Sequence, residues 1–313
     1  MRQYILYKYS IDINSLNKEA IYKTTNKFLR IKMTLHKVTS EIITESDNIC
    51  MKLKSGCAVS RFPFKCPSYM LNSTFDTNSN IYDDDNDIDI DREKEGNLLI
   101  EHRISTELQH VGLQIWRGGL LLADYILSNP DLFKDQVVLE LGSGVGLTSI
   151  VASFLAKEVI CTDIDIGGVL MLIRKNFIRN ISYVQSKFYI KELDFLNLDW
   201  HSVYRKKMDT ASIILAADVI YDDKITEGFV HTLAKLLNTE MPKTVYIALE
   251  KRYVFTITEM DTSAPMYEEF LRCIKRQNLN WNIEYLKIDF PQYFKYDRVK
   301  QMILMKIQNK SSN

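Results

Sequence analysis

The sequence predicts an α/β fold in which helices cover both faces of a mainly parallel sheet. From Leu98 onward, short apolar runs alternate with amphipathic stretches, and this alternation is typical of parallel strands joined by crossover helices. A glycine-rich segment, Glu140–Gly146, directly follows the first expected central strand. The last two apolar runs are joined by too little chain for a crossover helix, which predicts an antiparallel hairpin.

Five short apolar runs, several of them rich in β-branched residues, are expected to be buried parallel strands. They are Val137–Leu141, Glu158–Thr162, Lys187–Ile190, Ser212–Ala217 and Thr244–Leu249. The expected closing hairpin consists of Asn282–Asp289 and Val299–Ile307.

Helical periodicity appears between the expected strands. The segment Leu147–Lys157 follows the glycine-rich segment and is expected to be a helix. The apolar residues of a second expected helix are Ile166, Leu170, Ile173 and Phe177. Their steps of four, three and four place them on one helical face. We expect that face to pack on the sheet.

A change in composition divides the chain before this α/β region. Residues 72–97 contain a run of aspartates between Asp83 and Asp91, which repel one another and cannot pack. We interpret this segment as a disordered acidic spacer, with a lure for a basic partner as the alternative. Residues 1–71 are expected to be a partly ordered extension, in which Met33–Asn48 and Cys50–Phe64 form a hairpin on the main domain, residues 98–313.

The overall composition excludes several classes of protein. The 313 residues carry 40 basic and 40 acidic side chains, so we expect no strong nucleic-acid or anionic-lipid binding from net charge. No apolar stretch is long enough to cross a membrane, and we expect neither export nor a membrane span. Five scattered cysteines without a CxxC pair argue against disulfides and a metal site and favour a reducing compartment.

The glycine-rich segment indicates a nucleoside site. Gly142, Gly144 and Gly146 alternate with other residues, which permits a tight turn and a close approach of the backbone to a ligand at a helix start. Alone, this pattern fits a structural turn equally well. Asp163, however, ends the next expected strand, where a carboxylate can accept both ribose hydroxyls. The spacing GxGxG also differs from the GxGxxG of dinucleotide enzymes, which makes NAD the weaker candidate.

Four pieces of sequence carry a resemblance to a known family. They are Val111–Gly118, Glu140–Gly146, Ala217–Tyr221 and Glu250–Arg252. Together with the closing hairpin, they resemble the Rossmann-like seven-strand methyltransferases that use S-adenosyl-L-methionine, and within them protein-lysine methyltransferase family 16. The resemblance covers roughly Leu98 to Ile307.

The resemblance implies roles for individual residues. The implied cofactor-binding residues are Trp116, Glu140, Gly142, Ser143, Gly144, Gly146, Asp163, Ile164, Asp194, Phe195 and Ala217. Asp218 and Tyr221 form the DxxY pattern of the family and are the implied catalytic residues. Other interpretations remain open: Trp116 as a core residue, Asp194 as a cap or turn residue, and Glu250–Arg252 as a surface ion-pair cluster rather than a substrate rim.

The implied reaction is N-methylation of a lysine in a protein substrate. A lysine amine has a pKa near 10.4, so deprotonation at neutral pH costs roughly 4 to 5 kcal/mol. We expect an apolar channel to lower this cost while Asp218 and Tyr221 orient the amine, with water or Asp218 accepting the proton.

Three other functions remain as alternatives to lysine methylation. A nucleic-acid methyltransferase usually shows Asn/Asp-Pro-Pro-Tyr/Phe, where this chain has Asp218–Tyr221. A non-catalytic adaptor and a dinucleotide oxidoreductase are the other two alternatives. We expect a monomer, and the resemblance favours a nuclear over a cytoplasmic location.

Overall fold

The computed structural model describes residues 37–45, 49–53, 56–71, 95–256 and 261–309. Its centre is a seven-stranded sheet with the order β11-β12-β8-β7-β4-β5-β6. The strands are β4 Val137–Leu141, β5 Glu158–Asp163, β6 Lys187–Glu192, β7 Ile213–Ala217, β8 Thr244–Glu250, β11 Trp281–Leu286 and β12 Met302–Asn309. Strands β4 to β8 pair in parallel, and β12 pairs antiparallel with both β8 and β11. The predicted fold class and the closing hairpin are therefore confirmed.

One of the five expected buried strands is not buried. Phe188 and Ile190 of β6 are half-buried, and the other four residues of the strand are exposed. The reason is its place in the sheet, because β6 is the last strand and pairs only with β5. Lys187 and Lys191 on this edge discourage pairing with another strand.

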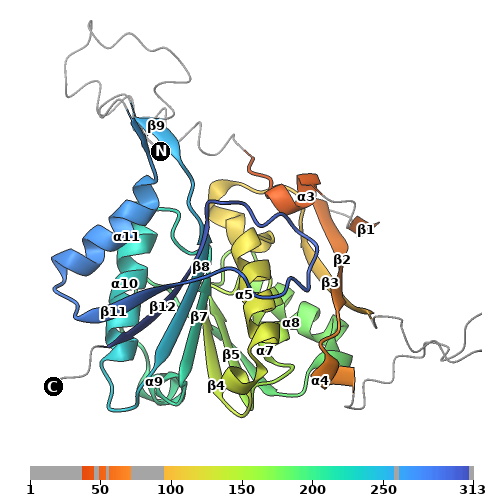
Figure 1. The fold of residues 1–313 in the computed structure, drawn as a ribbon, viewed down its shortest axis with the longest axis horizontal. Helices are drawn as coiled ribbons and strands as arrows, with labels where there is room; N and C mark the ends of the chain where they lie inside the picture. The colour runs from red at the N-terminus through yellow and green to blue at the C-terminus, as the bar shows by residue number, and fades with distance from the viewer. Residues whose placement is uncertain (1–36, 46–48, 54–55, 72–94, 257–260, 310–313) are drawn as a thin grey trace, which may run out of the picture.

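Helices cover both faces of the sheet (Figure 1). The first face carries α5 (Arg117–Ser128), α7 (Leu147–Ala152) and α8 (Val169–Arg179), and the second carries α9 (Ser202–Asp209), α10 (Asp223–Leu237) and α11 (Pro265–Arg276). The period of two in β8 divides its side chains between these layers: Tyr246 and Ala248 join the first core, and Val245, Ile247 and Leu249 join the second. The shorter helical segments are η2 Leu108–Leu113, α6 Pro130–Phe133 and η3 Ile181–Tyr183.

Two helix predictions need correction. The helix expected over Leu147–Lys157 ends at Ala152, and the next carbonyl, that of Ser153, accepts hydrogen bonds from the amides of residues 185 and 186 instead. Ile166 does not share the buried face of α8. It precedes the helix and is 40% exposed, because the two following glycines have φ angles of 69° and 79° and delay the helix start.

The N-terminal residues form a second, antiparallel sheet of β1 (Ile49–Lys52), β2 (Cys57–Lys65) and β3 (Glu95–Arg103). Strands β1 and β2 form a hairpin, but they lie almost wholly within Cys50–Phe64 and do not join that segment to Met33–Asn48 as expected. In the part of Met33–Asn48 that the structure describes, residues 37–45, there is no strand. This part contains the short helix α3 (Glu41–Glu45) and an isolated bridge from Val38 to Thr106.

Strand β3 changes the expected boundary of the acidic spacer. It begins at Glu95, so the last three residues of the predicted spacer 72–97 belong to a strand that pairs with β2 along its whole length. Residues 72–94 and 1–36 lie outside the described residues. A fragment that begins at Leu98 would lack the whole of β2.

Two asparagines of α8 fasten β3 to the main domain. The Asn176 side chain accepts from the Glu101 amide at 2.7 Å and donates to the Glu101 carbonyl at 2.9 Å. It also donates to the Val145 carbonyl in the glycine loop at 2.9 Å. One turn later, Asn180 makes the same pair of hydrogen bonds to Leu99, both at 2.9 Å. These side chains satisfy backbone groups that a neighbouring strand would otherwise satisfy.

Two remaining strands, β9 (Val254–Thr256) and β10 (Asp261–Ser263), form a separate antiparallel ribbon between β8 and α11. Among the described helices, none combines the length and the hydropathy that crossing a bilayer requires.

Candidate active site

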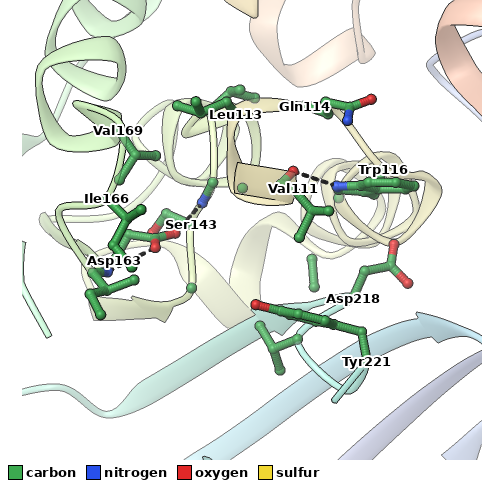
Figure 2. A pocket seen from close by; sticks show the side chains of 18 of the residues that line it. Val111, Leu113, Gln114, Trp116, Ser143, Asp163, Ile166, Val169, Asp218 and Tyr221 are labelled. Carbon is green, nitrogen blue, oxygen red and sulfur yellow. Dashed lines mark hydrogen bonds between the residues drawn. The ribbon is translucent and has the colours of Figure 1, made fainter. Parts of the chain in front are cut away.

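A cavity opens where the parallel strands β4, β5, β6 and β7 end. It brings together every predicted site residue except Gly146, although these residues lie up to about a hundred positions apart in the sequence. The residues in question are Trp116, Glu140, Gly142, Ser143, Gly144, Asp163, Ile164, Asp194, Phe195, Ala217, Asp218 and Tyr221. We call it the first cavity. Figure 2 shows Asp163 at one end of it and Trp116, Asp218 and Tyr221 at the other.

The glycine loop after β4 admits no side chain at two positions. Gly142 and Gly144 have φ angles of 66° and 55°. A Cβ on Gly144 would lie 2.9 Å from the Gly112 carbonyl oxygen, and one on Gly142 would lie 2.7 Å from Val219 Cγ1. The loop therefore lines the first cavity with backbone, as a closely approached ligand requires.

Gly146 has a different place from the one predicted. It is the residue before α7, has a φ of 84°, and does not line the first cavity. A Cβ there would lie 3.0 Å from Ile173 Cγ2. The glycine therefore permits close packing of the loop on α8.

Asp163 is held in one orientation by two backbone amides. Its Oδ2 accepts from Gly144 N at 2.7 Å, and its Oδ1 accepts from Ile164 N at 2.8 Å (Figure 2). Burial raises the pKa of this carboxyl to about 6 despite these two hydrogen bonds, so it is charged at neutral pH. Each carboxylate oxygen has a second lone pair, which leaves acceptor sites for ligand hydroxyls.

Glu140 and Ser143 stabilise the glycine loop. Its carboxylate is buried and accepts a hydrogen bond from the Ser149 hydroxyl. Burial raises the pKa of Glu140 to about 7. Ser143, also buried, donates to the carbonyl of Thr162 at 3.1 Å and so joins the glycine loop to β5.

Asp194 and Phe195 follow β6 and form another part of the wall. Asp194 Oδ1 accepts from the Leu196 amide at 2.8 Å, so this residue does close a turn, and it lines the first cavity as well. Phe195 packs on Phe229 of α10, with ring centroids 5.4 Å apart. An acceptor and an apolar surface thus lie side by side.

Asp218 joins three segments at the opposite end of the first cavity. Its Oδ2 accepts from Gly118 N at 2.7 Å, and its Oδ1 accepts from Glu250 N at 3.0 Å. Its own backbone is left-handed, with a φ of 52°, a strained conformation of a kind that clusters at functional sites. Burial raises the pKa of this carboxyl, although the two amides and Arg252 oppose the shift. The sequence did not predict that the Asp218 side chain binds the backbone at the start of α5 and at the end of β8.

Trp116 and Tyr221 flank Asp218. Trp116 is half-buried and donates from Nε1 to the Val111 carbonyl at 3.0 Å, so it is not a core residue. Burial raises the pKa of Tyr221 to about 12, which keeps the phenol protonated at neutral pH and able to donate a hydrogen bond. Both rings face the first cavity.

A second cavity of about 400 Å³ adjoins the first. Four residues line both: Val111, Trp116, Asp218 and Tyr221. The remaining residues of the second cavity are Val38, Leu108, Ile220, Leu249, Glu250, Lys251, Arg252, Pro265, Met266 and Tyr267. The sequence pointed to Glu250–Arg252 alone among them.

The N-terminal segment reaches the second cavity through Gln114. This buried side chain accepts from the Ser40 amide at 2.7 Å and donates to the Val38 carbonyl at 2.9 Å. The segment is thereby fixed to the loop that carries Trp116, and Val38 becomes part of the cavity wall. No local pattern in the sequence predicts this contact.

Sequence reasoning also missed residues of the first cavity. Gly112 lies opposite the glycine loop, and a Cβ on it would be 3.9 Å from both Asp163 Oδ2 and Gly144 Cα. A signal was present, because Gly112 belongs to the run Val111–Gly118 that carried the family resemblance, yet only Trp116 was assigned from that run. Within the described residues, no cluster of His, Cys, Asp or Glu is arranged to hold a metal ion.

The sheet order, the glycine loop after β4 and the Asp163 carboxylate at the end of β5 are those expected of the fold of class I S-adenosylmethionine-dependent methyltransferases. A family model described as lysine methyltransferase matches residues 93–277, which is more than half of the chain. The chain belongs to this lysine methyltransferase family.

Individual proteins are similar to this chain. Methyltransferase-like protein 22 of Mus musculus is 35% identical over 231 residues, which cover 67% of this chain and 58% of that protein. Protein-lysine N-methyltransferase EEF2KMT of Mus musculus is 28% identical over 206 residues, 63% of this chain and 58% of that protein. The chain thus spans less than two thirds of the length of these relatives. Among solved structures, magnesium protoporphyrin IX methyltransferase of Synechocystis PCC 6803 with bound SAH aligns with a TM-score of 0.42 and 12% identity, over 62% of this chain and 84% of that one.

Proposed function

We propose that the protein transfers a methyl group from S-adenosylmethionine to a lysine side chain of a protein substrate. The observation that carries the proposal is the meeting of two cavities at Trp116, Asp218 and Tyr221. The first has the polar and backbone groups that suit a nucleoside, and the second is lined mainly by apolar and aromatic side chains. A methyl donor and an acceptor amine can therefore meet at one shared wall.

The residues of the first cavity fit this cofactor. The glycine loop leaves a backbone surface without Cβ atoms, and Asp163 has acceptor sites for the two ribose hydroxyls. In this proposal Asp194 accepts from the adenine amine and Phe195 covers the ring. Trp116 faces the methionine part, where an indole attracts a cationic sulfonium. When bound, the cofactor supplies a methyl group that its positive sulfur has already activated.

The residues at the shared wall act on the acceptor. The apolar surroundings in the second cavity disfavour an ammonium and so lower the cost of deprotonating lysine. The neutral Tyr221 phenol and the fixed Asp218 carboxylate orient the amine, and the proton leaves to water. Orientation of this kind supplies a large part of the acceleration in a two-substrate reaction.

Asp218 is in this view chiefly a positioning group. Both of its oxygens already accept backbone hydrogen bonds, so it holds the start of α5 and the end of β8 in place. Its remaining lone pairs can accept from the substrate amine.

Calorimetry and isotope labelling test the proposal with the full chain. S-adenosylmethionine and its demethylated product should bind, whereas NAD should not. With methyl-labelled S-adenosylmethionine and a cell extract, mass spectrometry should find the label on lysine. Label on nucleic acid, or binding of NAD in preference to S-adenosylmethionine, would overturn the proposal.

A further inference from the structure

Two cations of this chain lie on the aromatic walls of the second cavity. Lys251 Nζ is 4.1 Å from the ring centroid of Tyr267, and the Arg252 guanidinium is 4.8 Å from that of Trp116. Both residues directly follow β8, and all four line the second cavity. The cavity therefore combines a rim of positive charge with rings that attract cations.

The acidic residues of the same cavity already have partners. Glu250 forms an ion pair with Arg117 at 2.8 Å, and both side chains are largely buried. The Asp218 carboxylate accepts from two backbone amides. Glu250 is therefore already paired, and among the described residues no ion pair joins Asp218 to either rim cation.

The rim cations themselves are weakly held. In the part of the chain that the structure describes, no ion pair involves Lys251, and its cationic group contacts the Tyr267 ring. Arg252 is half exposed and lies 3.8 Å from Glu41 of α3, a distance longer than that of a strong charge-assisted hydrogen bond. A hydrogen bond to a charged group is stronger than an exposed cation–π contact. A carboxylate from outside would thus displace the rings as the partner of these cations.

Movement of the two cations would also free the rings. The Tyr267 ring and the half-buried Trp116 ring would then be open to the incoming lysine, whose aliphatic chain can pack on such surfaces. The position of Glu41 beside Arg252 indicates that a carboxylate can reach this rim.

We propose that the acceptor is a lysine with acidic neighbours, whose carboxylates pair with Lys251 and Arg252 while the lysine enters the second cavity. This inference rests on the proposed function and specifies its substrate class. The recognition is electrostatic at the rim and apolar inside, so the neighbours of the lysine select the site and the cavity admits its side chain.

A charge-reversal experiment tests the proposal. The full chain, Lys251→Glu, and Lys251→Glu with Arg252→Glu are each incubated with methyl-labelled S-adenosylmethionine and cell extract, and labelled lysines are mapped by mass spectrometry. Wild type should label lysines next to Asp or Glu. At those sites we expect about a tenfold loss for the single variant and about a hundredfold loss for the double variant, since each reversal removes one attraction and places a like charge opposite the substrate carboxylate.

A matched control separates the rim from net charge. Lys275 is exposed on α11 and does not line either cavity, so Lys275→Glu changes the charge equally and should label as wild type does. A peptide from a labelled site with its acidic neighbours replaced by lysine should be methylated better by the double variant than by wild type.

The outcomes distinguish the two proposals. Labelled lysines without acidic neighbours, or unchanged rates in both rim variants, would overturn the acidic-substrate inference and leave the lysine methyltransferase standing. Binding of S-adenosylmethionine by wild type without any labelled lysine would overturn the proposed function and this inference with it. Calorimetry with S-adenosylmethionine shows whether each variant is folded.

Discussion

The two cavities share a wall but are built in different ways. Backbone forms much of the first: Gly142 and Gly144 leave no room for a side chain, and amides fix Asp163. The second consists of side chains from distant parts of the chain, from Val38 to Tyr267. Backbone surfaces tolerate little change, whereas side-chain surfaces can be altered one residue at a time. We therefore expect substitutions in the first cavity to weaken cofactor binding and substitutions in the second to change the preference among protein substrates.

Substitutions at the wall that the two cavities share should have the largest effect on turnover. Asp218→Asn keeps the size of the side chain but replaces one acceptor oxygen by a donor, so one of the amides of Gly118 and Glu250 loses its partner. Loss of a positioned group at a reacting centre costs about 10² to 10⁴ in turnover, and the unpaired amide costs about 1 to 3 kcal/mol of stability. Single-turnover methylation and urea unfolding measure the two effects. A wild-type rate for this variant would contradict the assigned position.

Asp163 should show the next largest effect, confined to the first cavity. Asp163→Ala removes two charge-assisted hydrogen bonds to the ribose, which we expect to weaken cofactor binding by about 2 to 4 kcal/mol. Calorimetry with S-adenosylmethionine measures the loss, and Lys275→Glu is the control. An unchanged dissociation constant would remove Asp163 from the cofactor site.

The pKa of Asp163 adds a pH dependence to the same experiment. Since burial raises this pKa to about 6, the carboxylate is charged above that pH and becomes protonated as the pH falls below it. Cofactor affinity should therefore be highest above pH 6 and fall on acidification, and the Asp163→Ala variant should lack this part of the dependence.

The difference between the cavities also explains what the sequence could predict. The first cavity is formed by loops that directly follow strands, so the motif Glu140–Gly146 and the carboxylate of Asp163 could be located from local patterns alone. Asp218 was located too, but its contacts with Gly118 and Glu250 were not, because they join segments about a hundred and about thirty residues away.

Most of the lining of the second cavity could not be predicted from the sequence. Val38 and Tyr267 are ordinary residues in their local sequence, and they become neighbours only when the N-terminal segment is fixed by Gln114 and α11 packs beside the sheet. The same holds for the pairing of β2 with β3 across residues 72–94. Gly146 shows the opposite case. Its local pattern is typical of a ligand contact, whereas its neighbour in the structure is Ile173.

Substitutions at two glycines test whether one part of the loop serves cofactor binding and another serves packing. Alanine at Gly144 or Gly146 would be forced into a left-handed conformation, which costs about 1 to 2 kcal/mol of stability in each case. Gly144→Ala should in addition weaken cofactor binding about tenfold or more, because its Cβ would push the loop away from Gly112. Gly146→Ala should bind normally once folded. Equal losses of affinity in the two variants would mean that Gly146 also serves the ligand.

Tyr221→Phe should have the smallest effect and shows to which cavity the hydroxyl belongs. The substitution keeps the ring that lines both cavities and removes one hydrogen-bond donor, which is worth about 0.5 to 1.5 kcal/mol, or roughly two- to tenfold. Because the pKa of Tyr221 is raised to about 12, the hydroxyl is not ionised between pH 7 and 9, and the variant should follow the wild-type pH profile over this range. Steady-state methylation of a mapped lysine peptide separates the possibilities: a lower kcat places the hydroxyl at the transferred methyl, and a higher KM for the peptide places it in the second cavity. A loss of a hundredfold or more, or a changed pH profile, would instead make Tyr221 a proton-transfer group and would contradict the positioning role proposed for it.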